Sequence, residues 1–249
     1  MIQILLETAT DVCSVALAVN GEVVAERTAT EVHQHASHLT VFIGEVLERA
    51  QVRTDQLDEI ILSDGPGSYT SLRVGAATAK GLCVALPGLR LRVVPTLLSV
   101  AALARDGRPT LATINSRRGE VYGQLFGPRP QVPGQDESAG YALWDGPQNI
   151  RLTEADWYDR VLNAAGRSGF NLTGPGQERV LEHLPEGHQV RAMSPRHCCA
   201  VHLLAPALAA GETDEPQTSA VRTVDVASYE PFYLNPPFVT KSKKKPLGR

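Results

Sequence analysis

The chain has 249 residues, a net charge of −3 at pH 7, and 43% hydrophobic and 20% charged residues. This composition is typical of a globular protein, and it excludes a uniformly basic surface that would bind nucleic acid all over. No apolar run approaches the ~20 residues that a transmembrane helix needs, and the first residues lack the basic start and cleavage site of a secretory signal. We therefore expect a cytoplasmic protein that makes no membrane contact.

Cysteine usage points the same way. The four cysteines, Cys13, Cys83, Cys198 and Cys199, include no CxxC pair, and structural zinc sites usually draw on such pairs. We expect reduced, mostly buried thiols and no metal site.

The N-terminal segment predicts three strands. Residues 2–7 are a short apolar run, and residues 12–19 alternate as a strand does. Asn20 and Gly21 both tolerate positive φ and form a strong hairpin signal, so residues 22–27 are expected to be the returning strand.

A helix is expected over residues 35–50, where large apolar side chains recur at helical spacing and form one core-facing stripe. A second, narrower stripe contains Val41 and Gly44, which are unusual on a face that water covers. Two interpretations are open at this point: the stripe is a chance pattern, or it is a contact surface for another helix.

Strands and helices then alternate. We expect a strand over 57–63, a helix over 71–86, a strand over 89–94 and a helix over 97–105. The order β-β-β-α-β-α-β indicates an α/β sheet that begins with antiparallel strands, as in one lobe of an actin-like protein. The opening hairpin disfavours the alternative, a plain doubly wound fold.

The second half of the chain predicts shorter elements separated by turns. They are a hairpin over 110–126, a loop-rich stretch over 127–148, a helix over 152–164, a strand and turn over 171–176 with a helix to about 184, a helix over 197–210 and a polar linker over 211–218.

The most informative loop lies between an expected strand and the start of an expected helix. Backbone N–H groups at such a place can bind an anion with the help of the helix dipole, although no GxxxxGK[ST] pattern exists here. A structural turn and a vestigial phosphate loop are both open interpretations. The residues concerned are Gly65, Pro66, Gly67, Ser68, Tyr69 and Thr70.

Other polar clusters carry weaker signals. His33, His35 and His38 lie at a helix start, but helical metal sites usually use histidines four apart, so capping or partner contact is expected. The sequence has no GxSxG element and no other recognisable nucleophile set, which argues against a peptidase. The lysine run 241–245 is expected to be a solvated charge run, with transient contact to nucleic-acid phosphates as the alternative.

Several segments together resemble one family. Residues 5–17, LLETATDVCSVAL, are similar to the opening of the bacterial TsaB (YeaZ) family, and residues 63–86, SDGPGSYTSLRVGAATAKGLCVAL, are similar to its most recognisable stretch. Residues 35–43 resemble the start of the family's first long helix, NSRRGEVY at 115–122 its second hairpin, and FYL at 232–234 its C-terminal motif. The match is nearly continuous in the N-terminal half and patchy afterwards.

The resemblance implies an actin/Hsp70/sugar-kinase-like fold with two lobes, the second one reduced. It implies no complete nucleotide site, no cofactor and no catalysis by this chain alone. The implied partners are the larger paralogue TsaD, the ATPase TsaE and a second copy of the chain, with tRNA reached through the complex. That complex forms threonylcarbamoyladenosine at position 37 of tRNAs that read codons starting with A. The interface implied by the family comprises His35, Val41, Gly44, Arg73, Ala76, Ala77 and Lys80.

The expected division is an N-terminal lobe over 1–105, a smaller lobe over 106–220, and a returning segment with a basic tail over 221–249. The sequence departs from the family pattern at Glu7, Ser71, Asn115 and Asn235. In actin-like ATPases a short acidic residue at the first strand end acts through water on the metal. The extra methylene of Glu7 would move its carboxylate by ~1.5 Å. The changes at Glu7 and Ser71 therefore weaken the alternative function, an ATPase or kinase of the same fold, and leave a scaffold role untouched.

Overall fold

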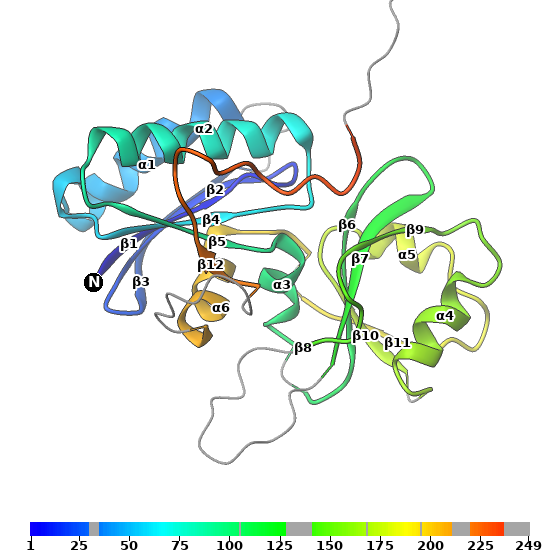
Figure 1. Ribbon diagram of the computed structural model, residues 1–249. Coiled ribbons are helices and arrows are strands. Elements are labelled where there is room, and N and C mark those ends of the chain that lie inside the picture. Colours follow the sequence, from blue (N-terminus) through cyan, green and yellow to red (C-terminus); the bar gives the residue numbers. More distant parts are fainter. Residues whose placement is uncertain are drawn as a thin grey trace, which may run out of the picture.

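The computed structural model describes residues 1–29, 35–104, 106–127, 141–167, 169–194, 196–210 and 220–236, with the backbone alone at 35, 36, 141 and 142. Two six-stranded sheets organise the chain (Figure 1). The first lobe is built on the sheet formed by residues 2–94 and 222–223, and the second lobe on the sheet formed by residues 110–192.

The first sheet is mixed and has the order β12-β5-β4-β1-β2-β3. Its central strands run parallel, and β2 and β3 form an antiparallel hairpin with β1. The hairpin turns at Asn20 and Gly21 with φ of 50° and 83°, as the sequence predicts. The strands are β1 (Ile2–Glu7), β2 (Cys13–Val19), β3 (Glu22–Ala29), β4 (Glu59–Ser63), β5 (Arg90–Val94) and β12 (Arg222–Thr223).

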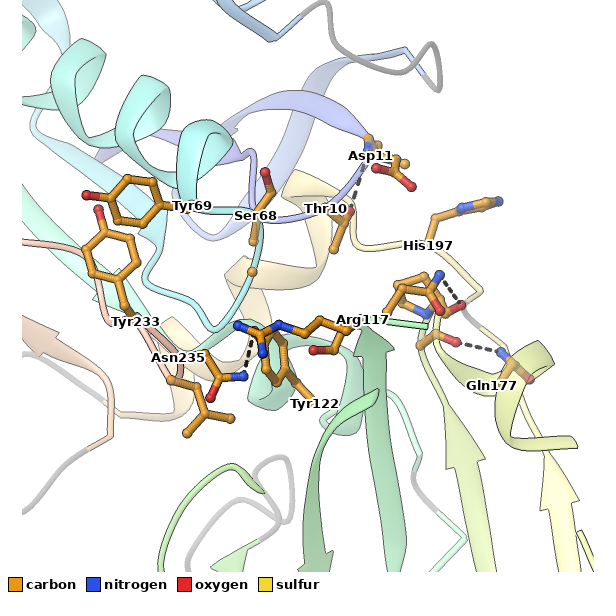
Figure 2. Close-up of a pocket in the computed structure, with 18 of the residues that line it drawn as sticks. Thr10, Asp11, Ser68, Tyr69, Arg117, Tyr122, Gln177, His197, Tyr233 and Asn235 are labelled. Atoms are coloured by element: carbon orange, nitrogen blue, oxygen red, sulfur yellow. Dashed lines mark hydrogen bonds between the residues drawn. The ribbon is translucent and has the colours of Figure 1, made fainter. Parts of the chain in front are cut away.

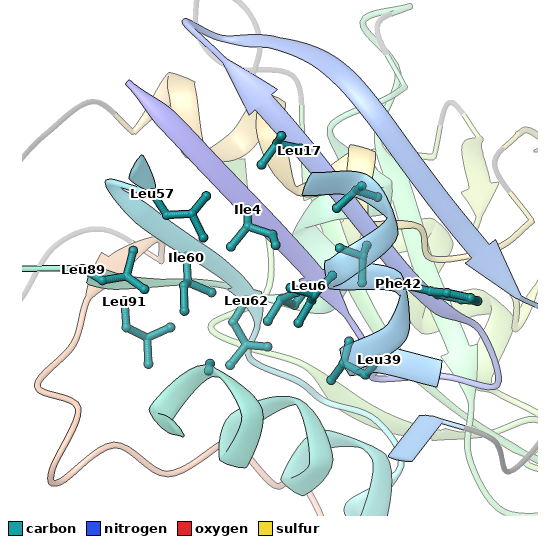
Figure 3. Packing of buried hydrophobic residues seen from close by; sticks show 14 of the residues in the cluster. Ile4, Leu6, Leu17, Leu39, Phe42, Leu57, Ile60, Leu62, Leu89 and Leu91 are labelled. Atoms are coloured by element: carbon teal, nitrogen blue, oxygen red, sulfur yellow. The ribbon is translucent and has the colours of Figure 1, made fainter. Parts of the chain in front are cut away.

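Two long helices, α1 (His35–Ala50) and α2 (Tyr69–Ala85), cover one face of this sheet (Figure 1). Figure 3 shows Ile4 and Leu6 of β1 packed beneath α1 together with side chains of β4. The intervening residue Leu5 belongs to the cluster on the opposite face. Both faces of β1 are therefore buried, which explains why it reads as a continuous apolar run. Each fully buried leucine or isoleucine contributes ~1.5–3 kcal/mol to folding.

The opposite face carries α3 (Thr96–Ala101), the 3₁₀ turn η2 (Ala200–Leu203) and α6 (Leu204–Ala209). Ala112 and Ile114 of the second sheet belong to the same buried cluster. This shared apolar layer joins the two lobes.

The second sheet has the order β11-β10-β6-β7-β8, and β9 also pairs with β7. Its remaining face is covered by α4 and α5, with Trp157 and Phe170 among the largest buried side chains. The elements are β6 (Thr110–Asn115), β7 (Glu120–Gly127), β8 (Tyr141–Ala142), β9 (Gln148–Arg151), α4 (Trp157–Ala164), β10 (Phe170–Thr173), α5 (Gln177–Leu181) and β11 (Val190–Ala192); the short η1 (Thr54–Gln56) precedes β4.

Four expected helices are shorter than the sequence pattern indicates, and one of them, expected to run to about residue 184, ends at Leu181. The one expected over 197–210 is a 3₁₀ turn followed by α6, because Pro206 has no N–H and fits only the first turn of an α-helix. The one expected over 152–164 begins at Trp157, because the Leu152 N–H bonds the Gly119 carbonyl at 2.9 Å and holds that segment against the hairpin. The one expected over 97–105 ends at Ala101.

Two of the four cysteines are buried, as expected. Cys13 and Cys198 are buried, Cys83 and Cys199 are half-buried, and all four are free thiols. Among the helices that the structure describes, none combines the length and apolarity needed to cross a bilayer.

Candidate functional site: the cleft between the lobes and the outer face of two helices

A cleft of about 580 Å³ lies between the two lobes. Figure 2 shows side chains from both lobes around it, among them Thr10 and Ser68 from the first lobe and Arg117 and Tyr122 from the second. Its walls are the β1–β2 turn (9–12), the loop before α2 (67–69), the β6–β7 turn (115–117), the loop before α5 (174–178), residues 196–197 and residues 233–236.

The glycine loop before α2 packs against the backbone of other segments of the chain. A Cβ on Gly67 would lie 2.3 Å from the Ala9 carbonyl oxygen, and the Ser68 N–H donates to that oxygen at 2.7 Å. Gly65 has φ of +102°, and a Cβ there would lie 2.4 Å from the Phe232 carbonyl oxygen. These glycines are needed for close packing between chain segments, and the Ser68 N–H that an anion would use already has an acceptor.

Only part of the loop reaches the cleft. Gly67, Ser68 and Tyr69 line it, Pro66 is buried, and Thr70 is exposed in the first turn of α2. The backbone of Ala9 on one side and of Phe232 on the other hold the loop in place.

The loop before α5 follows the same principle. Gly174 has φ of +89°, and a Cβ there would lie 2.3 Å from the Thr113 carbonyl oxygen. The Gly176 N–H donates to the same oxygen at 3.1 Å. This second glycine loop therefore packs on β6, as the first packs on the β1–β2 turn.

Glu7 is fully buried at the end of β1. Its Oε1 accepts hydrogen bonds from the Ala9 N–H at 2.6 Å and the Ser63 hydroxyl at 3.0 Å. Burial raises the pKa of its carboxyl to about 7, although those hydrogen bonds oppose the shift. The side chain does not reach the cleft wall, so it is placed to hold the turn between β1 and β2.

Charges of both signs line the cleft. Arg196 pairs with Glu178 at 3.3 Å, and Arg117 and Asp11 add one charge of each sign. The β6–β7 turn that carries Arg117 is fixed by Arg179, whose Nη1 donates to three backbone carbonyls at 3.3, 2.7 and 2.8 Å. The cleft is therefore close to electrically balanced and offers no concentrated positive field for a polyphosphate.

Asp64 is a functional candidate that sequence reasoning missed. Its carboxylate pairs with Arg222 at 2.8 Å and accepts from the Tyr229 hydroxyl at 2.9 Å, and its carbonyl accepts from the Phe232 N–H at 2.8 Å. Burial raises the pKa of this carboxyl, and the Arg222 guanidinium opposes the shift. Its position directly before the glycine loop was visible in the sequence, but partners more than 150 residues away were not.

A second candidate surface lies on the side of α1 and α2 that faces away from the sheet. We call it the outer face and define it by exposed residues of small or apolar type: Val41, Gly44, Ala77, Gly81 and Val84. Val41 is 52% and Val84 78% exposed, and a Cβ on either glycine would meet nothing within 4 Å.

The remaining residues of the expected interface have different surroundings in the structure. Ala76 is buried in the core and presents almost no surface. Arg73 lies over the Tyr69 ring at 4.6 Å, and Lys80 donates to the Ala227 carbonyl at 3.5 Å, so both contact neighbouring parts of the chain. Only the backbone of His35 is described. His33 and the lysine run 241–245 lie outside the described residues.

Comparisons with known proteins give a consistent answer. Residues 22–128 match the family model "TsaD: tRNA N6-adenosine threonylcarbamoyltransferase". The tRNA threonylcarbamoyladenosine biosynthesis protein TsaB of Haemophilus influenzae is 32% identical over 124 residues, which cover 47% of this chain and 50% of that protein. The Escherichia coli TsaB protein is 29% identical over 119 residues, with 47% and 51% covered. The chain thus spans about half the length of the curated relatives it matches.

The structural comparison covers nearly the whole chain, whereas the sequence matches cover about half of it. YeaZ from Pseudomonas aeruginosa superposes with a TM-score of 0.70 at 22% identity, covering 94% of this chain and 99% of that one. The expected α/β class with two lobes is confirmed by the two mixed sheets, and the chain has the fold of YeaZ. The chain is therefore related in sequence to TsaB proteins and shares the fold of YeaZ, which confirms the resemblance to the TsaB (YeaZ) family.

Proposed function

We propose that this chain is a non-catalytic scaffold and dimerisation subunit of the complex that forms N6-threonylcarbamoyladenosine at position 37 of tRNAs reading codons that start with A. Its partners are a TsaD paralogue, a TsaE ATPase and a second copy of the chain, and it reaches tRNA through the complex. The similarity to TsaB proteins supports the pathway, and the match of residues 22–128 to the TsaD family supports a paralogous partner.

One observation carries the scaffold role. The outer face is exposed to solvent, whereas the Ser68 N–H and the Glu7 carboxyl beside the cleft already have hydrogen-bond partners within the chain. Exposed apolar residues on two adjacent helices are a common feature of surfaces that another protein covers. The close approach of a partner helix would be helped by Gly44 and Gly81, where nothing lies within 4 Å of an added Cβ. Val41 and Val84 would supply the apolar contact.

The cleft supports the absence of nucleotide chemistry in this subunit. A phosphate loop needs free backbone N–H groups, and the Ser68 N–H is bonded to Ala9. A metal-dependent ATPase needs a carboxylate at the phosphates, and Glu7 is buried behind the turn. Within this proposal the lobes are 1–105 and 106–220, the segment 221–249 returns to the first lobe, and the site of action is the cytoplasm.

The experiment is reconstitution. The chain is mixed with its cognate TsaD, TsaE, threonylcarbamoyl-adenylate and a tRNA that reads A-starting codons, and modified adenosine is measured with and without it. We expect modification to depend on the chain, while the isolated chain neither binds nor hydrolyses ATP in titration calorimetry and phosphate-release assays. Equal modification without the chain would overturn the proposal. ATP turnover by the isolated chain would establish the ATPase alternative instead.

A further inference from the structure

The C-terminal strap, residues 222–236, runs from the edge of the first sheet along α2 to the second lobe (Figure 1). It begins as β12, which pairs with β5, and the Val224 N–H donates to the Leu91 carbonyl at 2.9 Å. It ends at residues 233–236, which form one wall of the cleft. The strap therefore touches both lobes, and its last residues border the cavity between them.

The strap is held firmly on the first lobe. The buried carboxylate of Asp64 binds Arg222 and Tyr229 at 2.8 and 2.9 Å, and its carbonyl binds the Phe232 N–H at 2.8 Å. Hydrogen bonds to a buried charged group are stronger than those between neutral groups. We call this set of contacts the clasp.

The contact with the second lobe is much weaker. The Asn235 Nδ2 donates to the Tyr122 hydroxyl at 3.2 Å in a part-buried position, and Figure 2 shows the two side chains meeting across the cleft. This is a single neutral hydrogen bond. Between it and the clasp, Tyr233 is held on α2: its ring lies against Tyr69 with centroids 4.7 Å apart, and its side chain is hydrogen-bonded to Arg73.

We propose that the end of the strap is a flap: residues 234–236 open and close the cleft by breaking and forming the Asn235–Tyr122 hydrogen bond, while the clasp and the contacts of Tyr233 keep the rest of the strap on the first lobe. The hinge lies between Tyr233, which Tyr69 and Arg73 hold on α2, and Asn235. The shared apolar layer between the lobes keeps them together when the flap opens, so access to the cleft changes without movement of whole lobes.

The test is Tyr122→Phe, which removes the hydroxyl and leaves the strap sequence intact. Its matched control is Tyr158→Phe, which removes a tyrosine hydroxyl that accepts from the Gln189 N–H at 2.8 Å elsewhere in the second lobe. Limited chymotrypsin cleavage between Leu234 and Asn235 reports the open fraction of the flap. Hydrogen exchange of the Phe232 amide reports the clasp.

We expect Tyr122→Phe to accelerate cleavage about fivefold, the effect of losing one neutral hydrogen bond, with unchanged protection of the Phe232 amide. Tyr158→Phe should cleave at the wild-type rate, and thermal unfolding of both variants monitors the fold. Cleavage at the wild-type rate in Tyr122→Phe would overturn the flap. Loss of Phe232 protection together with faster cleavage would also overturn it, because the strap would then detach as a unit without a hinge.

Discussion

The cleft and the outer face meet on one helix but differ in how their groups are used. At its N-terminal end α2 borders the cleft, where the Ser68 N–H is bonded to Ala9 and the Gly67 α-carbon faces the Ala9 carbonyl. On its outer side Val84 is 78% exposed and Gly81 faces open space. The glycines of the cleft allow segments of the chain to pack closely, whereas a side chain added at either glycine of the outer face would contact nothing in the monomer.

This difference shows which surface is free to act. In a loop whose sequence resembles a phosphate-binding loop, the backbone N–H donors can already be hydrogen-bonded within the protein. Loop composition alone therefore does not establish an anion site. Val41 and Val84 are exposed and have no role in the core of the monomer, which is why the scaffold proposal assigns them to a partner contact. The following predictions test the two surfaces against each other.

The largest expected effect is on association. Val41→Arg places a charge on the apolar outer face, and we expect it to weaken binding to TsaD or to a second copy at least 100-fold, or more than ~2.7 kcal/mol, because the charge would be buried without a partner. Val41 is 52% exposed, so the free energy of unfolding should change by less than about 0.5 kcal/mol. Size-exclusion co-elution and urea unfolding measure the two quantities.

The matched control is Val24→Arg, because Val24 on β3 is 47% exposed and lies off the outer face. It should leave association unchanged. Equal binding by Val41→Arg and the wild type would remove the outer face as the interface.

The second prediction concerns the cleft loop. Gly67→Ala would place a Cβ 2.3 Å from the Ala9 carbonyl oxygen, and we expect it to destabilise the chain by about 2–3 kcal/mol, because backbone on both sides must shift. Urea unfolding measures the change. A neutral effect would mean that the loop has room to move, and the argument that its glycines serve internal packing would fail.

The third prediction is a pH dependence. Burial raises the pKa of Glu7 from 4.5 to about 7, so between these values the folded chain holds a proton that the unfolded chain has released. Stability should therefore fall as the pH rises through this window, by about 3 kcal/mol in total, and level off above it. Glu7→Gln cannot ionise and keeps an oxygen for Ala9 and Ser63, so this part of the pH dependence should vanish.

Urea unfolding at pH 5, 6, 7 and 8 tests this, with Asp11→Asn as a matched carboxylate-to-amide change at an exposed position. If Glu7→Gln follows the wild-type curve, another group causes the dependence. The same variant should support tRNA modification in the reconstituted complex, because Glu7 has no chemical role in the scaffold proposal.

The sequence predicted the first lobe well because its signals are local. The Asn20-Gly21 pair predicted where β2 turns back into β3, and the helical spacing of apolar residues predicted the bounds of α1. The exposed position of Val41 and Gly44 also followed from this spacing. The shorter helices of the second half were overestimated, since Pro206 and the hydrogen bond of Leu152 end regular structure that periodicity alone would continue.

The contacts that define the strap could not be predicted from the sequence. Asp64 and Tyr229 are separated by 165 positions, and no local sequence pattern predicts which aspartate will bind the strap. The short strand β12 has only two residues and little periodicity to detect. For the same reason the burial of Ala76 and the use of Lys80 by the strap were not visible, although both were assigned to the expected interface.

The smallest expected effect separates folding from association on the outer face. Gly81 lies inside α2 with nothing within 4 Å of an added Cβ, so Gly81→Ala should stabilise the isolated chain by about 0.5–1 kcal/mol through better helix propensity. A partner helix that packs closely there would meet the new methyl group, so affinity for the partner should fall while stability rises. Gly88→Ala is the contrasting glycine change, since φ of +95° makes alanine strained at an open site outside the helix. A gain in both stability and affinity for Gly81→Ala would place the close contact elsewhere on the outer face, and opposite signs would locate it at this turn of α2.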